Sequence, residues 1–585
     1  MPPFMPPVLT PEELRVHFPL DRSEIAPATF EIGFALAGTV SAGAYTAGVL
    51  DYVIEALDGW TAAKATGDPD APPHNVAIST IGGASGGAIN GAVLLRAGSF
   101  EFPHGAVAAN PLFNAWAGPS CVTLDKLLAP GRAKSGAGPL ALFNTSAIES
   151  QVATILKTGG KPKNRPYLTN PLRLIASIGN LAGIPYRLAS RGDTSLGLDM
   201  TAHADYVRFA LAVTDGCARP DASPRKDEYA LSGQSPLNWD RLGDAALATS
   251  AFPIAFDARK VERTIEQLIY RAVLVPGAQG ADDEVIPLVP ASDRLPDDLV
   301  RSGKTSATAV DGGTMDNEPI GVVRQELAGL GARNPRQGSD AHRAVLLVDP
   351  FADRGTQPKA PQSIFDLVGQ VLGLFMQQAR YKPEDLALAH QPTVFSRYLI
   401  APKANNAEGS PALSAGALYG FLGFLDQRLL VHDFELGRYD AYLFLTQDFR
   451  VPSDNVVVNG AAWTAAQRQT YTSGKGYAYA GQPENEKDFL PIIPLVASLR
   501  DAPPSTPKPP GIYAVPDAIP TAIEARLGFV FDALWTDLNV EGLLGGVASA
   551  AVRAAWTMWG RAAARDWAVA QLQGALPKPP GAPSA

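Results

Sequence analysis

The sequence predicts an α/β fold in which a mainly parallel central sheet is covered by helices on both faces, a three-layer α/β/α arrangement. Two consecutive strand–helix units carry this prediction. An apolar strand at 31–36 leads into a helix at 44–57, and a second apolar strand at 76–81 leads into a helix at 88–95. Strands that alternate with helices in this way are typical of βαβ units, whose strands lie parallel in one sheet.

Four later apolar runs extend the predicted sheet. They lie at 172–178, 206–213, 306–310 and 344–348. Each run has the length and apolar character of a buried strand. The sheet is therefore expected to use residues from the first 350 positions of the chain.

Composition and charge restrict the class of protein. Hydrophobic residues make up 46% of the 585 residues and charged residues 18%, which is typical of a globular chain. The length allows two or three domains. The net charge of −9 argues against a nucleic-acid partner. An acidic chain can still act on lipids, because interfacial enzymes dock through apolar surface.

The cysteines and the N-terminus bear on the compartment. Cys121 and Cys217 are the only cysteines, too few for a disulfide framework or a cysteine-rich zinc site, and they fit a reducing compartment. Residues 1–18 contain neither a basic segment nor an apolar core of the kind found in Sec signal peptides. Since no run of about 18 apolar residues occurs, we expect no transmembrane helix. These features predict a cytoplasmic or peripheral membrane protein.

The turn between the second strand and its helix carries a serine flanked by glycines. Its sequence is Gly82-Gly83-Ala84-Ser85-Gly86-Gly87. A serine on so tight a turn projects its hydroxyl out of the sheet, and its small neighbours let a substrate carbonyl approach. The helix that begins just after it directs free N–H groups and its positive dipole end at the same point. This pattern is typical of the nucleophile elbow of serine acyl hydrolases.

A serine hydroxyl needs a base to become a nucleophile at neutral pH, and the sequence offers an aspartate for this role. None of the seven histidines follows a strand in a glycine-rich loop. Asp311 ends the predicted strand at 306–310 and is followed by Gly312 and Gly313. Open α/β sheets hold their sites at such C-terminal strand ends. Asp316, beyond the glycine turn, is an alternative.

These motifs together resemble those of the patatin-like phospholipase family, in its bacterial form. The serine motif is Gly83-Ala84-Ser85-Gly86-Gly87 and the aspartate motif is Asp311-Gly312-Gly313, continued by Asn317 and Pro319. The segment 248–256 is similar to the family's block between the two motifs. The resemblance covers about residues 30–350, and the order and spacing of the motifs make it specific.

The resemblance implies a lipid acyl hydrolase of the phospholipase A or esterase type that works through a Ser–Asp dyad. Ser85 would attack an ester carbonyl, and Asp311 would take the serine proton and return it to the leaving alcohol. The oxyanion would be held by backbone N–H groups of the loop 38–43 and of Gly86. The family implies neither a metal nor an organic cofactor. The substrate would be an acyl ester of a glycerophospholipid or of a neutral lipid.

The oxyanion loop departs from the family pattern, which is similar to G-G-G-x-R-G. This chain has Gly38-Thr39-Val40-Ser41-Ala42-Gly43. Thr39 and Val40 replace glycines, and Ala42 replaces the arginine. Because valine avoids positive φ, either Val40 lies in ordinary β space or the loop has another shape. Loss of the arginine affects a preference for phosphate headgroups more than ester hydrolysis itself.

Composition divides the chain around this domain. A proline-rich stretch at 501–510 is typical of a semi-rigid linker. The expected parts are an N-terminal lead at 1–28, the patatin-like catalytic domain at 29–350, a largely helical C-terminal extension packed on the core at 351–500, the proline-rich linker at 501–520, a helical segment at 521–573 and a disordered tail at 574–585.

Two other interpretations of function stay open at this point. The altered oxyanion loop suits a catalytically weak lipid-binding or scaffold protein that keeps the fold. A conventional Ser–His–Asp esterase would instead use His432, which follows a helix expected at 418–430.

A tryptophan stripe marks the C-terminal helical segment. Val552, Trp556, Trp559, Ala563 and Trp567 follow helical spacing and lie on one face. Such a stripe is usually core packing. The alternative is an interfacial helix whose rings lie at the level of lipid headgroups.

Overall fold

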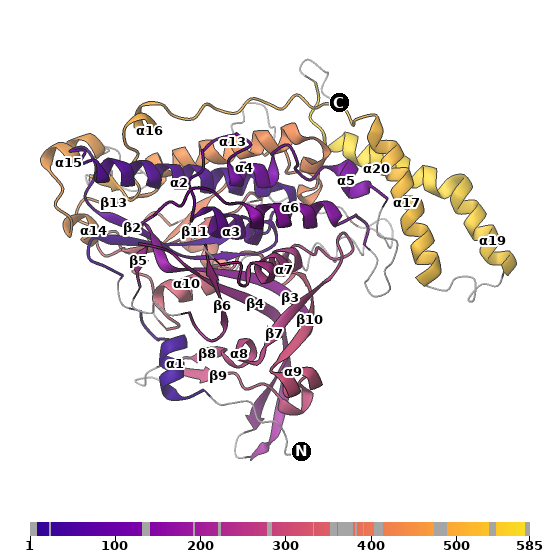
Figure 1. Ribbon diagram of the computed structural model, residues 1–585, viewed down its shortest axis with the longest axis horizontal. Coiled ribbons are helices and arrows are strands. Elements are labelled where there is room, and N and C mark those ends of the chain that lie inside the picture. Colours follow the sequence, from indigo (N-terminus) through magenta and orange to yellow (C-terminus); the bar gives the residue numbers. More distant parts are fainter. Residues whose placement is uncertain are drawn as a thin grey trace.

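A central β-sheet and the helices that cover its two faces form the main body of the molecule (Figure 1). The computed structural model describes residues 9–22, 25–130, 141–190, 193–219, 224–233, 235–277, 283–331, 333–351, 360, 378–380, 383–389, 391–402, 413–472, 488–537 and 546–579. Within these residues, ten strands make up the sheet.

The first five strands across the sheet are parallel. Their order is β12 (Arg397–Ile400), β11 (Arg343–Val348), β1 (Thr29–Leu36), β2 (Asn75–Gly83) and β3 (Leu168–Ser190). The predicted α/β fold with a mainly parallel sheet is confirmed. The strands expected from the sequence lie within strands of the structure, except that β4 ends at Ala212, one residue before the end of the strand expected at 206–213.

The remaining pairings of the sheet are largely antiparallel, which the sequence did not indicate. β3 is antiparallel to both β4 (Asp193–Ala212) and β10 (Lys304–Asp311), and β10 is antiparallel to β7 (Arg259–Thr264). Only two residues separate β3 from β4, and so short a connection permits only a hairpin. Two short strands, β5 (Cys217–Ala218) and β6 (Glu228–Ser232), add parallel pairs at the margin.

β2 and β10 lie along the same edge of β3 and run towards each other. Gly83, the last residue of β2, pairs with Ala176 of β3, and Asp311, the last residue of β10, pairs with Ile178. β4 occupies the opposite edge of β3 at these positions. The C-terminal ends of β2 and β10 therefore meet with only Ser177 of β3 between them.

Helices cover both faces of the sheet. One layer contains α2 (Gly43–Ala65), α3 (Gly86–Ala97), α4 (Pro111–Trp116), α6 (Ser146–Lys157), α7 (Trp239–Thr249) and α13 (Gln427–Leu443), and α10 (Ile320–Ala328) covers the other face (Figure 1). Alternate residues of β1 point to the two layers. Phe34 and Leu36 belong to the large cluster with α2, whereas Ala35 packs with α10.

Two sheet glycines let α10 approach the strands closely. A Cβ atom on Gly33 or on Gly82 would lie 2.6 Å from a methyl carbon of Val323 in α10. Larger side chains there would push the helix away from the sheet. Since α10 follows the turn after Asp311, this close packing also fixes where that turn lies.

The remaining elements are short and lie around this core. They are α1 (Pro11–His17), α5 (Leu124–Leu128), α8 (Ile265–Ile269), β8 (Ala272–Val275), β9 (Glu284–Pro287), α9 (Asp297–Ser302), α12 (Pro383–Ala389), β13 (Arg450–Pro452), α14 (Val456–Asn459), α15 (Ala465–Tyr471), β14 (Phe489–Pro491) and α16 (Ser498–Asp501).

The region 351–500 shares both the sheet and its helical layer with the preceding domain. β12 pairs with β11, and α13 packs along α2. At the crossing, a Cβ atom on Gly48 would overlap the carbonyl oxygen of Phe434, and one on Gly437 would overlap that of Tyr45. The Tyr45 hydroxyl also donates to Asp440, at 3.0 Å. The two helix backbones thus lie in direct contact.

The C-terminal helices form an arm that projects from the body (Figure 1). The arm contains α17 (Ala518–Asp537), α19 (Gly546–Ala555), a π-helical turn at Trp556–Gly560 and α20 (Arg561–Ala575). α20 takes in residues 574 and 575 of the expected tail, and residues 580–585 lie outside the described residues. None of the described helices has the length and apolar character needed to cross a membrane.

The glycine contact between α2 and α13 predicts an effect on stability. Gly48→Ala places a methyl group against the Phe434 carbonyl and should lower the free energy of unfolding by about 2–4 kcal/mol. Gly574→Ala is the control, because among the described residues no atom outside the backbone of its own helix turn lies within 4 Å of its Cβ position. The stability of this variant should rise slightly, since alanine has a higher helix propensity than glycine. Thermal or urea unfolding measures both, and equal stabilities would contradict the assigned contact.

Candidate active site

Ser85 lies on a strained turn between β2 and α3. Its backbone has φ 50°, and its side chain is almost completely buried. The Ser85 N–H donates to the Thr249 hydroxyl at the end of α7, at 2.8 Å. A Cβ atom on Gly87 would overlap the Leu36 carbonyl oxygen, so this turn requires glycine two positions after the serine. Neighbouring structure thus holds the strained conformation in place.

Asp311 faces Ser85 from the end of β10. Its carboxyl group is buried next to the Ser85 turn and accepts the Gly313 N–H at 2.7 Å. Burial raises the pKa of Asp311 to about 7, against the opposing effect of the hydrogen bonds from Gly313 and Ser85. A Cβ atom on Gly312 would overlap the Ser177 carbonyl, which explains why the turn begins with glycine.

The side chain of Ser177 supports the meeting of the two strand ends. Its hydroxyl lies 3.4 Å from the Gly83 carbonyl oxygen and 3.1 Å from the Asp316 carbonyl oxygen. Ser177 therefore contacts both the serine turn and the aspartate turn. Sequence reasoning missed it, because nothing local distinguishes Ser177 from other small strand residues.

Thr249 was also missed as a contact of Ser85. It lies in the segment 248–256, which the sequence analysis selected only for its likeness to a family block. Its position in that block is the sequence feature that could have identified Thr249 as a site residue.

Asp316, the alternative base, is turned towards another partner. Its carboxylate accepts a hydrogen bond from the Tyr206 hydroxyl, at 2.8 Å. Asp311 is the aspartate that the structure brings to Ser85.

Asn317 connects the aspartate turn with the oxyanion loop. Its carbonyl accepts the Gly38 N–H at 3.1 Å. Its side-chain oxygen lies where a Cβ atom on Gly38 would be, and 2.5 Å from the Cβ position of Gly313. Glycine at both positions lets the amide fit between the two segments.

The oxyanion loop passes directly over the start of α3. Residues Val40–Ala42 form one 3-10 turn, and a Cβ atom on Gly86 would overlap the Thr39 hydroxyl. Within the described part of the chain, the N–H groups of Thr39, Val40 and Gly86 have no hydrogen-bond acceptor. These donors remain available to a bound group.

Val40 does not lie in ordinary β space, which was one of the two alternatives that the sequence left open. It has φ 48°, in the left-handed region that β-branched residues avoid. The loop keeps a conformation suited to glycine with valine in it, because the packing around it overrides the residue's own preference. Ala42, which stands where the family pattern has arginine, is completely buried.

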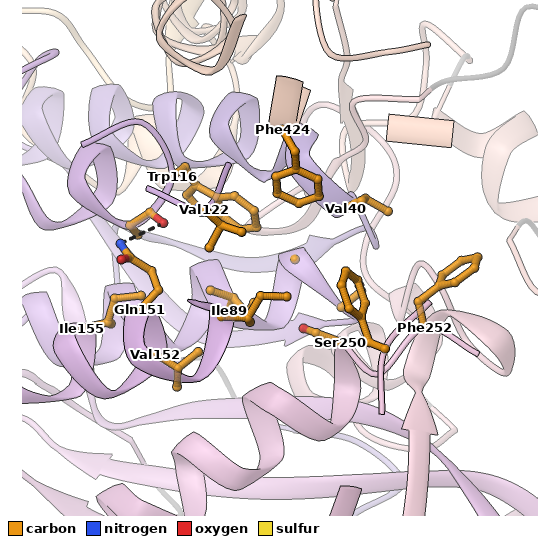
Figure 2. Close-up of a pocket in the computed structure, with 15 residues that line it drawn as sticks. Val40, Ile89, Trp116, Val122, Gln151, Val152, Ile155, Ser250, Phe252 and Phe424 are labelled. Atoms are coloured by element: carbon orange, nitrogen blue, oxygen red, sulfur yellow. Dashed lines mark hydrogen bonds between the residues drawn. The ribbon is translucent and has the colours of Figure 1, made fainter. Parts of the chain in front are cut away.

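An apolar pocket opens beside Ser85. Its walls include Val40, Ile89, Trp116, Val122, Val152, Ile155, Phe252 and Phe424 (Figure 2). Gln151 also lines it, but its amide donates to the carbonyls of Asn114 and Ala115, at 2.7 and 3.2 Å. The polar end of Gln151 is thus satisfied, and the pocket offers mainly hydrocarbon to a ligand.

Comparison with known proteins agrees with this arrangement. Residues 34–324 match the family model described as patatin-like phospholipase. This part of the chain is a patatin-like phospholipase domain. The matched residues include both Ser85 and Asp311, so the resemblance found in the sequence is confirmed at the level of the family.

One relative extends the similarity beyond the patatin-like domain. The uncharacterized protein y4iI of Sinorhizobium fredii (strain NBRC 101917 / NGR234) is 29% identical over 524 residues, which cover 82% of this chain and 72% of that protein. The aligned part is longer than the family match. The relative therefore shares residues of the C-terminal region as well.

His432 lies in α13, outside the matched domain, and hydrogen-bonds with residues other than Ser85 and Asp311. Its Nδ1 atom lies 2.8 Å from the Ser414 hydroxyl and 3.0 Å from the Asp433 carboxylate. Neither Ser85 nor Asp311 is among its hydrogen-bond partners. The structure gives no support to His432 as the base for Ser85.

The raised pKa of Asp311 predicts a dependence of stability on pH. A carboxyl with a raised folded-state pKa favours the folded state while it is protonated, and this advantage is lost as the pH rises from about 4 to 7. Asp311→Asn removes the buried charge and should stabilise the protein at pH 8 by about 2–4 kcal/mol, with little change at pH 4. Urea unfolding at both pH values measures this. A variant that is less stable than wild type at pH 8 would contradict the assigned burial.

Proposed function

We propose that this protein is a lipid acyl hydrolase in which Ser85 and Asp311 act as a catalytic dyad. The family match supports a lipid hydrolase in general. The observation that carries the finer proposal is the placement of the Ser85 hydroxyl next to a buried carboxyl whose pKa is raised to about 7. A base with a pKa near the working pH combines the correct protonation state with useful basicity.

The reaction proceeds in two halves through an acyl-enzyme. Ser85 Oγ attacks the ester carbonyl while its proton passes to Asp311, and Asp311 then gives that proton to the leaving alkoxide. In the second half, Asp311 takes a proton from water, the resulting hydroxide attacks the acyl group, and Ser85 leaves with the proton returned. Both side chains are regenerated at the end of the cycle. Water is consumed, and the alcohol and the carboxylic acid are released.

The negative oxygen of each tetrahedral intermediate is stabilised by backbone donors. The N–H groups of Thr39, Val40 and Gly86 are the candidates, because the loop and the start of α3 lie next to Ser85 and these groups have no acceptor among the described residues. Donors fixed in advance at a buried site stabilise such charge at little reorganisation cost.

The pocket supports an acyl chain as the group transferred. Its walls are aliphatic and aromatic, and it begins at Ser85. Burial of each methylene group stabilises binding by about 0.8 kcal/mol. The buried Ala42 supplies no cation for a phosphate, so the proposal covers acyl esters of both glycerophospholipids and neutral lipids.

A catalytically weak lipid-binding protein is the second candidate. The observation that favours it is the strained Val40 in the oxyanion loop, since a loop that relaxes would no longer direct its donors at the oxyanion. The two candidates differ in turnover: a binding protein takes up lipid but releases no acid.

The dyad predicts the loss of hydrolysis in two variants. Ser85→Ala and Asp311→Asn should each reduce hydrolysis of a short-chain p-nitrophenyl ester by at least about 10³-fold, because they remove the nucleophile and the base. His432→Ala should retain activity. Labelling of Ser85 by a fluorophosphonate checks the nucleophile directly. A folded wild-type protein without turnover on any ester would favour the binding protein.

The pH profile provides a separate prediction for Asp311. As a base it must be ionised, so kcat/KM should rise with pH, with a midpoint near 7, and then remain level. Initial rates from pH 5 to 9, on a substrate that is stable in this range, measure the curve. A rate that falls as the pH rises through 7 would exclude this role.

The C-terminal arm offers a surface for peripheral membrane contact within this proposal. Trp559 and Trp567 are 70% and 68% exposed, and Met558 is 59% exposed. Trp556 instead stacks on Phe531 of α17, with ring centroids 4.6 Å apart. Exposed indole rings favour the interface between water and lipid.

The base of the arm is close to the acyl pocket. Ile519 and Ile523 of α17 belong to the same hydrophobic cluster as Phe256 and Phe424, which line the pocket. Arg553 pairs with Asp532, and Arg565 pairs with Glu524. These arginines therefore hold the helices of the arm together, and the apolar residues carry the proposed contact with lipid.

Membrane contact predicts a binding defect in an arm variant. Trp559→Ala with Trp567→Ala should weaken co-sedimentation with phosphatidylcholine liposomes about tenfold or more and leave hydrolysis of a soluble ester unchanged. Leu237→Ala, at a residue that is 62% exposed outside the arm, is the control. Equal liposome binding by both variants would show that the arm does not dock.

A further inference from the structure

The C-terminal extension touches the oxyanion loop through Ser41. The Ser41 hydroxyl donates to the carbonyl of Gly420, a residue 379 positions further along the chain. Ser41 is completely buried, so this bond is made away from solvent. The acceptor belongs to a 3-10 turn at Leu418–Gly420, which is followed by another at Leu422–Leu425.

Glycines let this segment lie directly on the loop. A Cβ atom on Gly420 would lie 3.1 Å from the Thr39 carbonyl oxygen, and Gly420 has φ 85°. A Cβ atom on Gly423 would overlap the Ser41 hydroxyl. Neither glycine has room for a side chain on the side facing the loop.

Aromatic packing anchors the same segment to the patatin-like domain. Phe421 has ring contacts with Phe143 at 5.7 Å and with Phe252 at 5.9 Å between centroids. Phe424, three residues on, lines the acyl pocket together with Val40 (Figure 2). Each glycine that contacts the loop, Gly420 and Gly423, is thus followed directly by a phenylalanine that packs on the patatin-like domain.

The loop needs such support because Val40 is strained. A β-branched residue at positive φ persists only where its surroundings fix it. Val40 is preceded by Thr39 and followed by Ser41, and both neighbours touch Gly420 or Gly423. On the other side, Gly38 is bound to Asn317. The loop is fixed at its start by the domain and at its centre by the extension.

We propose that residues 418–425 act as a clamp that positions the oxyanion loop, with Ser41 and Gly420 as the positioning residues. The C-terminal extension is then a working part of the site, because it keeps the Thr39 and Val40 N–H groups directed at the oxyanion. This inference rests on the proposed function for its kinetic consequences. The conformation of the loop can be measured independently of any activity.

Removal of the Ser41 hydroxyl tests the clamp. Ser41→Ala should lower kcat on a soluble p-nitrophenyl ester about 10- to 100-fold, the effect of impaired oxyanion donors. KM should change less than about threefold, and the pH midpoint should remain near 7, since Asp311 is untouched. Ser150→Ala, on the exposed face of α6, is the matched control. A kcat within twofold of wild type for Ser41→Ala would overturn the proposal.

A second substitution tests whether the loss of activity in Ser41→Ala comes from strain at Val40 or from a nonspecific disturbance of the site. In Val40→Gly, the loop reaches positive φ without strain. The double variant Val40→Gly/Ser41→Ala should therefore recover at least part of the kcat lost in Ser41→Ala. If Val40→Gly restores none of the kcat lost in Ser41→Ala, Ser41 does not act by holding Val40, and the clamp is rejected.

Amide hydrogen exchange keeps the test independent of turnover. Peptides covering residues 37–44 should exchange faster in Ser41→Ala than in wild type or Ser150→Ala, while peptides of β1 remain protected. Unchanged exchange of the loop would overturn the clamp. A wild-type protein without hydrolysis but with this change in exchange would refute the proposed function and retain the clamp.

Discussion

The site depends on one feature of the sheet: β2 and β10 share an edge of β3 and approach each other end to end. The parallel strand delivers the turn with Ser85, and the antiparallel strand delivers Asp311, with only Ser177 of β3 between their last pairs. Hydrogen bonds of the sheet fix this separation without help from either functional side chain. A serine and an aspartate 226 positions apart in the numbering are thus held in contact by the most rigid part of the fold.

Glycine is used around this junction to bring backbones together. Gly33 and Gly82 admit α10, Gly312 admits the aspartate turn against β3, and Gly48 and Gly437 bring α13 against α2. Each contact would be blocked by a single Cβ atom. The consequence is a closely packed site that keeps Asp311 from water, and this desolvation is what raises its pKa.

Ser85 and Val40 are both strained, and both are held by distant parts of the chain. Ser85 at positive φ is fixed by Thr249 at the end of α7, and Val40 at positive φ lies where the 418–425 segment contacts the loop. A loop with glycine at position 40 needs less support of this kind. The chain combines a stiffer loop with an extension that packs over it, and the similarity to the Sinorhizobium relative also extends beyond the patatin-like domain.

The sequence alone determined what is local: the strand–turn–helix units, the glycine-flanked Ser85 and the Asp311-Gly312-Gly313 turn, because periodicity and turn chemistry act over a few residues. It also indicated the family and the mainly parallel sheet. Only the tertiary structure decided that β10 runs antiparallel, that Thr249 and Ser177 contact the turns that carry Ser85 and Asp311, and that Val40 adopts positive φ. The contacts responsible join residues that are 94, 164 and 379 positions apart. Local preference gives no information about such contacts, and in the case of Val40 tertiary packing overrides it.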